Sequence, residues 1–133
     1  MDATILIVED EMLVALEMEA ILEDHGCRVL GIAADLEEAL VYTGEPIDLA
    51  MVDLNLRDGQ TGPEIGQRLA TQNNTSVLFV TANPRLLGDG ISGTLGVLTK
   101  PTDEASLIAA VNFALQRRRG MPAQPPATLR CFG

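Results

Sequence analysis

Short apolar runs alternate along the chain with segments in which apolar residues recur at the spacing of a helix. The first run, residues 4–8, has the length and the β-branched content of a strand that is covered on both faces. Residues 11–25 carry Leu, Ala and Ile at helical spacing and are followed by Gly26, which predicts a helix that ends there. The alternation continues with strands expected at 27–34, 47–53, 76–82 and 96–101 and with helices expected at 35–43, 62–72 and 103–119.

A strand followed by a helix, five times over, predicts an α/β fold with a doubly wound parallel sheet. The fourth helix is the exception, because residues 83–96 contain four glycines and glycine disfavours helix. We therefore expect the fourth helix to be short or irregular. The predicted domain spans residues 1–119. Residues 120–133, with three prolines and no periodic pattern, are expected to form a flexible tail.

Side chains that can bind a ligand or take part in a reaction lie at the carboxyl ends of four of the five predicted strands. They are, in chain order, Glu9 with Asp10, Asp53, Thr81 and Lys100, the last being the only lysine of the sequence. Because the carboxyl ends of parallel strands meet at one edge of a sheet, we expect these side chains to lie together there.

Three carboxylates at one edge repel one another unless a cation lies between them. A site with oxygen ligands and without His or Cys favours Mg²⁺, which binds few protein ligands and keeps part of its water. The hydroxyl of Thr81 and the ammonium of Lys100 leave a space that matches a phosphoryl group. The residues therefore predict a phosphoryl-transfer site in which a carboxylate can form an aspartyl-phosphate.

Four segments carry a resemblance that covers residues 3 to about 119, namely "ILIVEDE", "MVDLNL", "LFVTA" and "LTKP". With these segments the chain resembles the receiver domain of two-component response regulators, of the stand-alone, single-domain type. The resemblance implies a flavodoxin-like (βα)5 fold with strand order 2-1-3-4-5. It also implies a signalling protein that is not an enzyme, apart from catalysing its own phosphorylation and dephosphorylation.

The resemblance assigns roles to the residues at the sheet edge. Asp53 would accept a phosphoryl group from a histidine kinase or a histidine phosphotransfer protein. Mg²⁺ would be held by Glu9, by Asp10 most directly, by Asp53 itself and by the backbone carbonyl of Asn55.

The same resemblance implies how the phosphoryl group would be bound and used. Thr81 and Lys100 would each bind one of its oxygens, and Pro101 would follow a cis peptide bond. The phosphorylated protein would bind a downstream protein target or pass the phosphoryl group on in a relay. It would be a monomer, or a weak dimer that depends on phosphorylation.

Two positions depart from the family pattern. Receivers carry an aromatic residue three positions before the lysine and another directly after the Lys-Pro pair, where this chain has Val97 and Thr102. The usual coupling between the threonine and an aromatic residue therefore cannot operate. We hypothesise that phosphorylation orders or moves residues 83–96 instead, with Thr81 and backbone groups as the trigger.

The formal net charge of −10 is unevenly distributed. Residues 1–116 hold all 19 acidic residues and five basic residues, a net charge of −14. Such an acidic body repels nucleic acid and anionic membranes, and we expect neither as a partner. Without a secretory signal or a membrane-spanning run, the sequence indicates a cytoplasmic protein in which Cys27 and Cys131 stay reduced.

Other functions remain open at this point. One alternative is a receiver-like scaffold that is not phosphorylated. A small Mg²⁺-dependent phosphatase of the haloacid-dehalogenase type fits less well, because such enzymes need a second acid two residues after the nucleophile, where this chain has Asn55. Flavin binding fits poorly too, because the acidic "EDEM" after the first strand would repel a phosphate.

Overall fold

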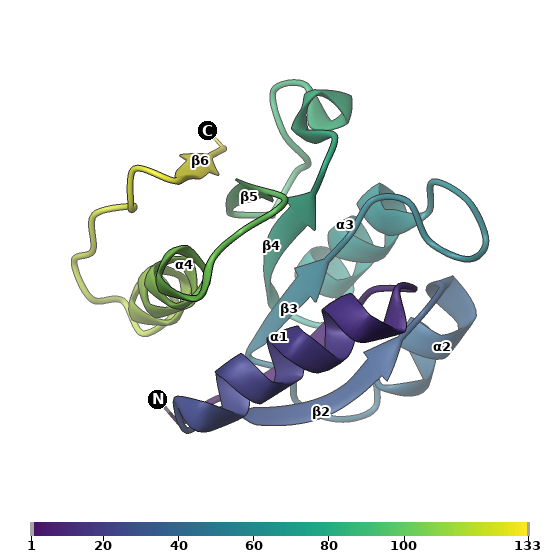
Figure 1. Ribbon diagram of the computed structural model, residues 1–133, viewed down its shortest axis with the longest axis horizontal. Helices are drawn as coiled ribbons and strands as arrows, with labels where there is room; N and C mark the ends of the chain where they lie inside the picture. The colour runs from purple at the N-terminus through teal and green to yellow at the C-terminus, as the bar shows by residue number, and fades with distance from the viewer. Residues whose placement is uncertain (1, 133) are drawn as a thin grey trace.

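The computed structural model describes residues 2–132 and has a central sheet with helices on both faces (Figure 1). The strands are β1 (Thr4–Val8), β2 (Arg28–Ala33), β3 (Leu49–Val52), β4 (Ser76–Thr81), β5 (Gly96–Thr99) and β6 (Leu129–Cys131). The helices are α1 (Met12–Asp24), α2 (Leu36–Val41), α3 (Gly62–Gln72) and α4 (Glu104–Arg118), with a short 3₁₀ turn, η1 (Pro84–Leu87). Within residues 2–132, no helix has both the length and the apolar character needed to cross a membrane.

The strands are ordered β2-β1-β3-β4-β5-β6, and neighbours run parallel except β6, which is antiparallel to β5. The predicted α/β fold and the predicted order of the first five strands are therefore confirmed. One face of the sheet packs against α1 and α4, and the other packs against α2 and α3. β1 and β3 lie between other strands and are almost wholly buried, as their unbroken apolar sequences predict.

Two helices begin at aspartates that cap them. The carboxylate of Asp35 accepts a hydrogen bond of 2.8 Å from the N–H of Glu38 at the start of α2. Asp103 accepts one of 2.7 Å from the N–H of Ser106 at the start of α4. Such caps satisfy N–H groups that have no partner within the helix, and they fix where each helix leaves the sheet edge.

The chain between β4 and β5 is irregular, as its glycines predict. Only Pro84–Leu87 is helical, and this turn ends at Gly88, which has a φ of 54°. Gly90 and Gly93 also have positive φ values, of 117° and 84°, which other residues rarely adopt. The prediction of a short or irregular fourth helix is confirmed, and α4 of the structure is the fifth predicted helix.

The C-terminal tail differs from its prediction. The proline-containing chain after α4 forms neither helix nor strand, but Leu129–Cys131 form β6 and extend the sheet beyond β5. Leu129 is buried in the core on the α1 and α4 side, and Phe132 packs beside Phe79, with ring centroids 6.4 Å apart. These two apolar contacts place residues 129–132 against the sheet, where the proline-containing sequence predicts a flexible tail.

Candidate functional site

The carboxyl ends of β1, β3, β4 and β5 meet at one edge of the sheet. The register pairs Val8 with Val52, the last residues of β1 and β3, and pairs Thr81 with Thr99, the last residues of β4 and β5. The residues that follow these strands therefore lie side by side. This edge brings together Glu9, Asp10, Asp53, Thr81 and Lys100.

Lys100 lies at the centre of this group. Its Nζ donates hydrogen bonds to Oδ2 of Asp53, at 2.8 Å, and to Oε1 of Glu9. The side chains are shielded from water, with 16% of Lys100, 2% of Glu9 and 10% of Asp53 exposed. One ammonium thus balances two buried carboxylates in part, and the pocket keeps a net negative charge that suits a cation.

Burial and pairing act in opposite directions on these groups. Burial raises the pKa of Glu9, although hydrogen bonds from Lys100 and from the N–H of Glu11 favour its charged form. Burial by itself would lower the pKa of Lys100, but the hydrogen bonds to Asp53 and Glu9 outweigh it and raise that pKa. Lys100 therefore stays charged at neutral pH, and a fixed positive charge lies beside Asp53.

Asp53 is held by its own backbone and by the neighbouring strand. Its N–H donates to the carbonyl of Val8 at 2.9 Å, and its Oδ1 accepts a hydrogen bond of 2.7 Å from the N–H of Leu54. With this bond to Oδ1 and the Lys100 bond to Oδ2, lone pairs remain on both oxygens. The carboxylate is therefore fixed in position and still able to bind a metal ion or to act as a nucleophile.

The carboxylates of Glu9, Asp10 and Asp53 fit a small divalent cation. One oxygen of each lies within 4.8 Å of the others, and oxygens on opposite sides of Mg²⁺ are about 4.2 Å apart. Asp10 is exposed, so its side chain can move over this small difference while the ion keeps water ligands. The donor atoms are all oxygen, which suits Mg²⁺ better than zinc.

The loop after β3 turns back onto Asp53. Leu54 and Leu56 are buried, which leaves Asn55 exposed between them. Gly62, the first residue of α3, lies so close that a Cβ there would be 2.0 Å from the carbonyl oxygen of Asp53. Gly62 is therefore a positioning residue, which the sequence analysis did not identify because only the fold brings the two backbones together.

Arg57 holds the same loop against the start of α2. Its Nη2 lies 2.6 Å from Oδ2 of Asp35 and 2.9 Å from Oε2 of Glu38, and its N–H donates to the carbonyl of Ala34 at 3.0 Å. A backbone N–H is the first cause of the lowered pKa of each carboxylate, and Arg57 is the next. We call these contacts of Arg57 with Asp35 and Glu38 the Arg57 clamp. The sequence analysis did not identify it, because an arginine among turn-forming residues is a weak signal.

Thr81 links the site to the irregular segment before β5. Its side chain is buried, and Oγ1 accepts a hydrogen bond of 3.1 Å from the N–H of Asn83. Its carbonyl accepts one of 2.9 Å from the N–H of Lys100, which ties the ends of β4 and β5 together. The peptide bond between Lys100 and Pro101 is cis, as expected.

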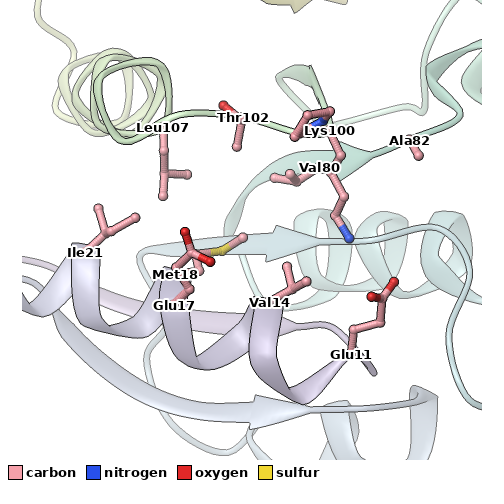
Figure 2. Close-up of a pocket in the computed structure, with 11 residues that line it drawn as sticks. Glu11, Val14, Glu17, Met18, Ile21, Val80, Ala82, Lys100, Thr102 and Leu107 are labelled. Atoms are coloured by element: carbon pink, nitrogen blue, oxygen red, sulfur yellow. The ribbon is translucent and has the colours of Figure 1, made fainter.

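A groove of about 390 Å³ runs from the site between α1 and the start of α4 (Figure 2). Its apolar lining includes Val14, Met18 and Leu107. Figure 2 shows the side chain of Lys100 extending from the end of β5 toward the start of α1, where Glu11 lies. Because Lys100 lines both, the groove and the carboxylate pocket form one continuous site.

Comparison with known proteins agrees with this geometry. The family model for the response regulator receiver domain matches residues 5–112. The chain belongs to the response regulator receiver family. The phyllosphere-induced regulator PhyR of Methylorubrum extorquens is 33% identical over 118 residues, which are 86% of this chain and 44% of PhyR.

Two solved structures show the same relationship. The response regulator PhyR from Brucella abortus matches with a TM-score of 0.81 and 29% identity, over 90% of this chain and 50% of that chain. The receiver domain of PhyR from Erythrobacter litoralis matches with a TM-score of 0.74 and 27% identity, over 95% and 96% of the two chains. The chain therefore spans about half the length of PhyR and nearly all of its separate receiver domain.

Proposed function

We propose that this receiver takes up a phosphoryl group on Asp53 from a histidine kinase or a histidine phosphotransfer protein. The observation that carries the proposal is the 2.8 Å contact of Lys100 Nζ with Oδ2 of Asp53, in a pocket to which Glu9 and Asp10 add two carboxylates. A nucleophilic carboxylate, a fixed positive charge and oxygens for a divalent cation are the groups that phosphoryl transfer uses. The proposed receiver unit is residues 1–119.

In the proposed transfer, an oxygen of Asp53 attacks the phosphorus of a phosphohistidine. The new P–O bond forms as the P–N bond breaks, and the bonding electrons leave with the imidazole, which takes a proton from solvent. Lys100 stabilises the negative charge on the phosphoryl oxygens, and the hydroxyl of Thr81 donates a hydrogen bond to one of them. The chain thus supplies the nucleophile and two of the groups that stabilise the transferred charge.

Mg²⁺ supplies further charge neutralisation when it is bound. Its proposed protein ligands are Glu9, Asp10, Asp53 and the backbone carbonyl of Asn55. Asp10 and Asn55 are exposed, so that the ion can enter without any opening of the core.

The surface beside the pocket suits a protein as the phosphodonor. Met12, Leu13 and Leu16 of α1 are 54%, 84% and 45% exposed. Exposed apolar side chains gathered at one helix end offer a contact for the apolar face of another helix. A helix that carries the donor histidine and packs there would bring its phosphoryl group to the adjacent pocket.

The proposed output passes through residues 83–96. The hydroxyl of Thr81 accepts a hydrogen bond from the N–H of Asn83, the first residue of this segment. A phosphoryl oxygen that draws the hydroxyl toward Asp53 would loosen that bond and free the segment to move. The protein would then bind a target or pass the phosphoryl group on, as a monomer or as a weak phosphorylation-dependent dimer.

Intact-protein mass spectrometry after incubation with acetyl phosphate tests this function. We expect a single phosphoryl adduct in the presence of Mg²⁺ and none after chelation of the metal. Asp53→Asn should abolish the adduct. Asp58→Asn, which changes an exposed aspartate of the same loop, is the matched control and should keep it.

Two results would contradict the proposal in different ways. An adduct that persists in Asp53→Asn would place the phosphoryl group on another residue. No adduct under any condition would leave a receiver-like scaffold that binds its partners without phosphorylation.

A further inference from the structure

β6 covers an edge of the sheet that would otherwise be open. It pairs antiparallel with β5, and the N–H of Phe132 continues the pairing with a 3.0 Å hydrogen bond to the carbonyl of Leu95. An open strand edge presents unpaired N–H and C=O groups, to which another chain can add a strand. The tail therefore occupies a surface that is able to bind an extended segment.

Arg130 ties the tail to the irregular segment before β5. Its Nη2 donates to the carbonyl of Pro84 at 3.1 Å, and its Nη1 donates to the carbonyl of Gly88 at 2.9 Å. These carbonyls lie at the start of η1 and directly after its end. One side chain of the tail therefore holds both ends of the turn that stands in place of a full fourth helix.

Phe132 provides a second, apolar contact in the same region. It packs on the face of the sheet that α2 and α3 cover, beside Phe79, and the guanidinium of Arg130 lies 5.4 Å from the centre of its ring. A Cβ added to Gly90 would be 2.5 Å from the Phe132 ring. The glycine-rich segment is thus shaped to receive this ring.

A short path of contacts joins the tail to the site. The N–H of Lys100 donates to the carbonyl of Thr81, and Oγ1 of Thr81 accepts from the N–H of Asn83. The next residue is Pro84, whose carbonyl accepts from Arg130. Thr81 is therefore separated from a contact that holds the tail by one hydrogen bond, to Asn83, and one peptide bond, from Asn83 to Pro84.

The tail can leave without removal of any helix from the core. β6 has three residues, of which Arg130 and Cys131 are exposed and Leu129 is buried. The chain that connects it to α4 forms neither helix nor strand. Few buried apolar contacts and short pairing are typical of segments that open at low free energy.

We propose that residues 129–132 are a releasable strand, and that an extended strand of a partner protein takes its place on β5 after phosphorylation. The inference rests on the proposed phosphorylation of Asp53. The phosphorylated site draws the hydroxyl of Thr81 away from Asn83, the carbonyl of Pro84 shifts away from Arg130, and the tail leaves the edge of β5.

The tail itself shows which chemistry the partner strand needs. Leu129 contacts the core on the α1 and α4 side, and Phe132 packs on the opposite face. A competing strand therefore needs an apolar residue and, three positions later, an aromatic one. Between them, a cationic residue in the place of Arg130 would satisfy the carbonyls of η1, and the acidic body of the protein also favours a basic partner.

Hydrogen exchange on the full chain tests the release, with beryllofluoride and Mg²⁺ as the phosphoryl analogue. We expect exchange in residues 95–99 and 128–132 to rise about tenfold, the change that loss of one or two net hydrogen bonds brings. Exchange in β1 should stay constant. Thr81→Ala lacks the hydroxyl that accepts from Asn83, so its exchange should already be raised without the analogue and should not rise further with it. Thr99→Ala, at the exposed neighbour of Thr81 in the sheet, should respond like wild type.

A fluorescent peptide of residues 127–132, with serine in place of the cysteine, tests whether the edge of β5 accepts a strand. Wild type loaded with beryllofluoride should bind the peptide about tenfold more tightly than unmodified wild type, because the tail no longer competes. Phe132→Ala should show the same increase without beryllofluoride, because its tail is held less firmly. Cys131→Ser, which changes an exposed side chain of the same strand, is the control and should bind like wild type.

Failure of the release and failure of phosphorylation give different results. If acetyl phosphate modifies Asp53 while exchange in residues 128–132 is unchanged, the releasable strand is overturned and phosphorylation stands. If no phosphoryl group is taken up, the proposed function is overturned together with the trigger.

Equal peptide binding by wild type and Phe132→Ala would overturn the competition between the tail and the peptide for the edge of β5. A dimer that forms through exchanged tails would overturn the partner strand in favour of a second copy of this chain.

Discussion

The loops that follow β3 and β4 both border the candidate site, and one arginine holds each of them, but in different ways. Arg57 lies within the loop after β3 and forms ion pairs with Asp35 and Glu38 across to α2. Arg130 comes from the far end of the chain and holds the segment after β4 by two backbone carbonyls. The first contact joins two loops inside the domain, whereas the second lasts only as long as the tail stays on β5.

The difference indicates which half of the site is fixed. The loop after β3 packs on Asp53 through Gly62 and leads into α3, which has 11 residues. The segment after β4 has a turn of four residues, and its support is a strand of three. The half of the site that carries Asp53 is therefore firmly held, and the half that follows Thr81 is able to change.

The largest expected changes in stability come from the substitutions Gly62→Ala and Gly96→Ala, one in each half of the site. At Gly62 the new Cβ would lie 2.0 Å from the carbonyl oxygen of Asp53, within packed elements. We expect a loss of about 3 kcal/mol in the free energy of unfolding there. At Gly96 the Cβ would lie 2.5 Å from the carbonyl oxygen of Arg130, and only the tail has to move, so that we expect about 1 kcal/mol. Urea unfolding measures both losses.

Gly44→Ala is the matched control for this pair. Nothing lies within 4 Å of a Cβ at Gly44, and its stability should stay close to that of wild type. In Gly96→Ala, exchange in residues 128–132 should also rise without any phosphoryl analogue. Equal losses of stability at Gly62 and Gly96 would show that the tail is as firmly held as the loop after β3.

Lys100→Met would test how the site balances the charges of Glu9 and Asp53. The change leaves Glu9 and Asp53 as two shielded carboxylates without their shared ammonium. We expect a loss of about 2 kcal/mol in the absence of Mg²⁺, because buried charge without a partner is costly. Mg²⁺ should stabilise the variant more than it stabilises wild type. Thermal unfolding with Mg²⁺ and with a chelator measures both effects.

Arg68→Met provides the comparison for Lys100. It removes an exposed pair with Glu64 on α3, at 3.4 Å, which should cost less than about 0.5 kcal/mol and leave the effect of Mg²⁺ unchanged. If Lys100→Met is as stable as wild type without Mg²⁺, then the ammonium does not offset the repulsion of the carboxylates.

The contents of the candidate site could be predicted from the sequence more fully than its supports. Asp53, Thr81 and Lys100 each end or follow an apolar run, and a parallel sheet gathers the ends of such runs whatever its loops do. The irregular segment at 83–96 could be predicted for a similarly local reason, because glycine disfavours helix wherever it occurs. Local patterns were sufficient for both features.

The supports depend on packing between distant parts of the chain. No spacing connects Arg57 to Asp35, which meet only after two loops come together. The prolines of the tail favour disorder, and Leu129 and Phe132 override them only because β5 offers an edge and the missing helix leaves room for a ring. Tertiary contacts of this kind outweigh local propensity and have no periodic signal in a single sequence.

The smallest expected effect concerns how acid weakens the Arg57 clamp. The N–H of Glu38 and then Arg57 lower the pKa of Asp35 below its ordinary value of 3.8. A carboxylate with a lowered pKa stabilises the fold above the pKa of the unfolded chain, and this contribution is lost as the pH falls through the folded value. Asp35→Asn, which keeps a good helix cap without the charge, should therefore be less stable than wild type at neutral pH, and the difference should shrink below about pH 4. Urea unfolding across this range measures it. A difference that stays constant in acid would mean that the shape of the cap, and not its charge, holds the loop after β3.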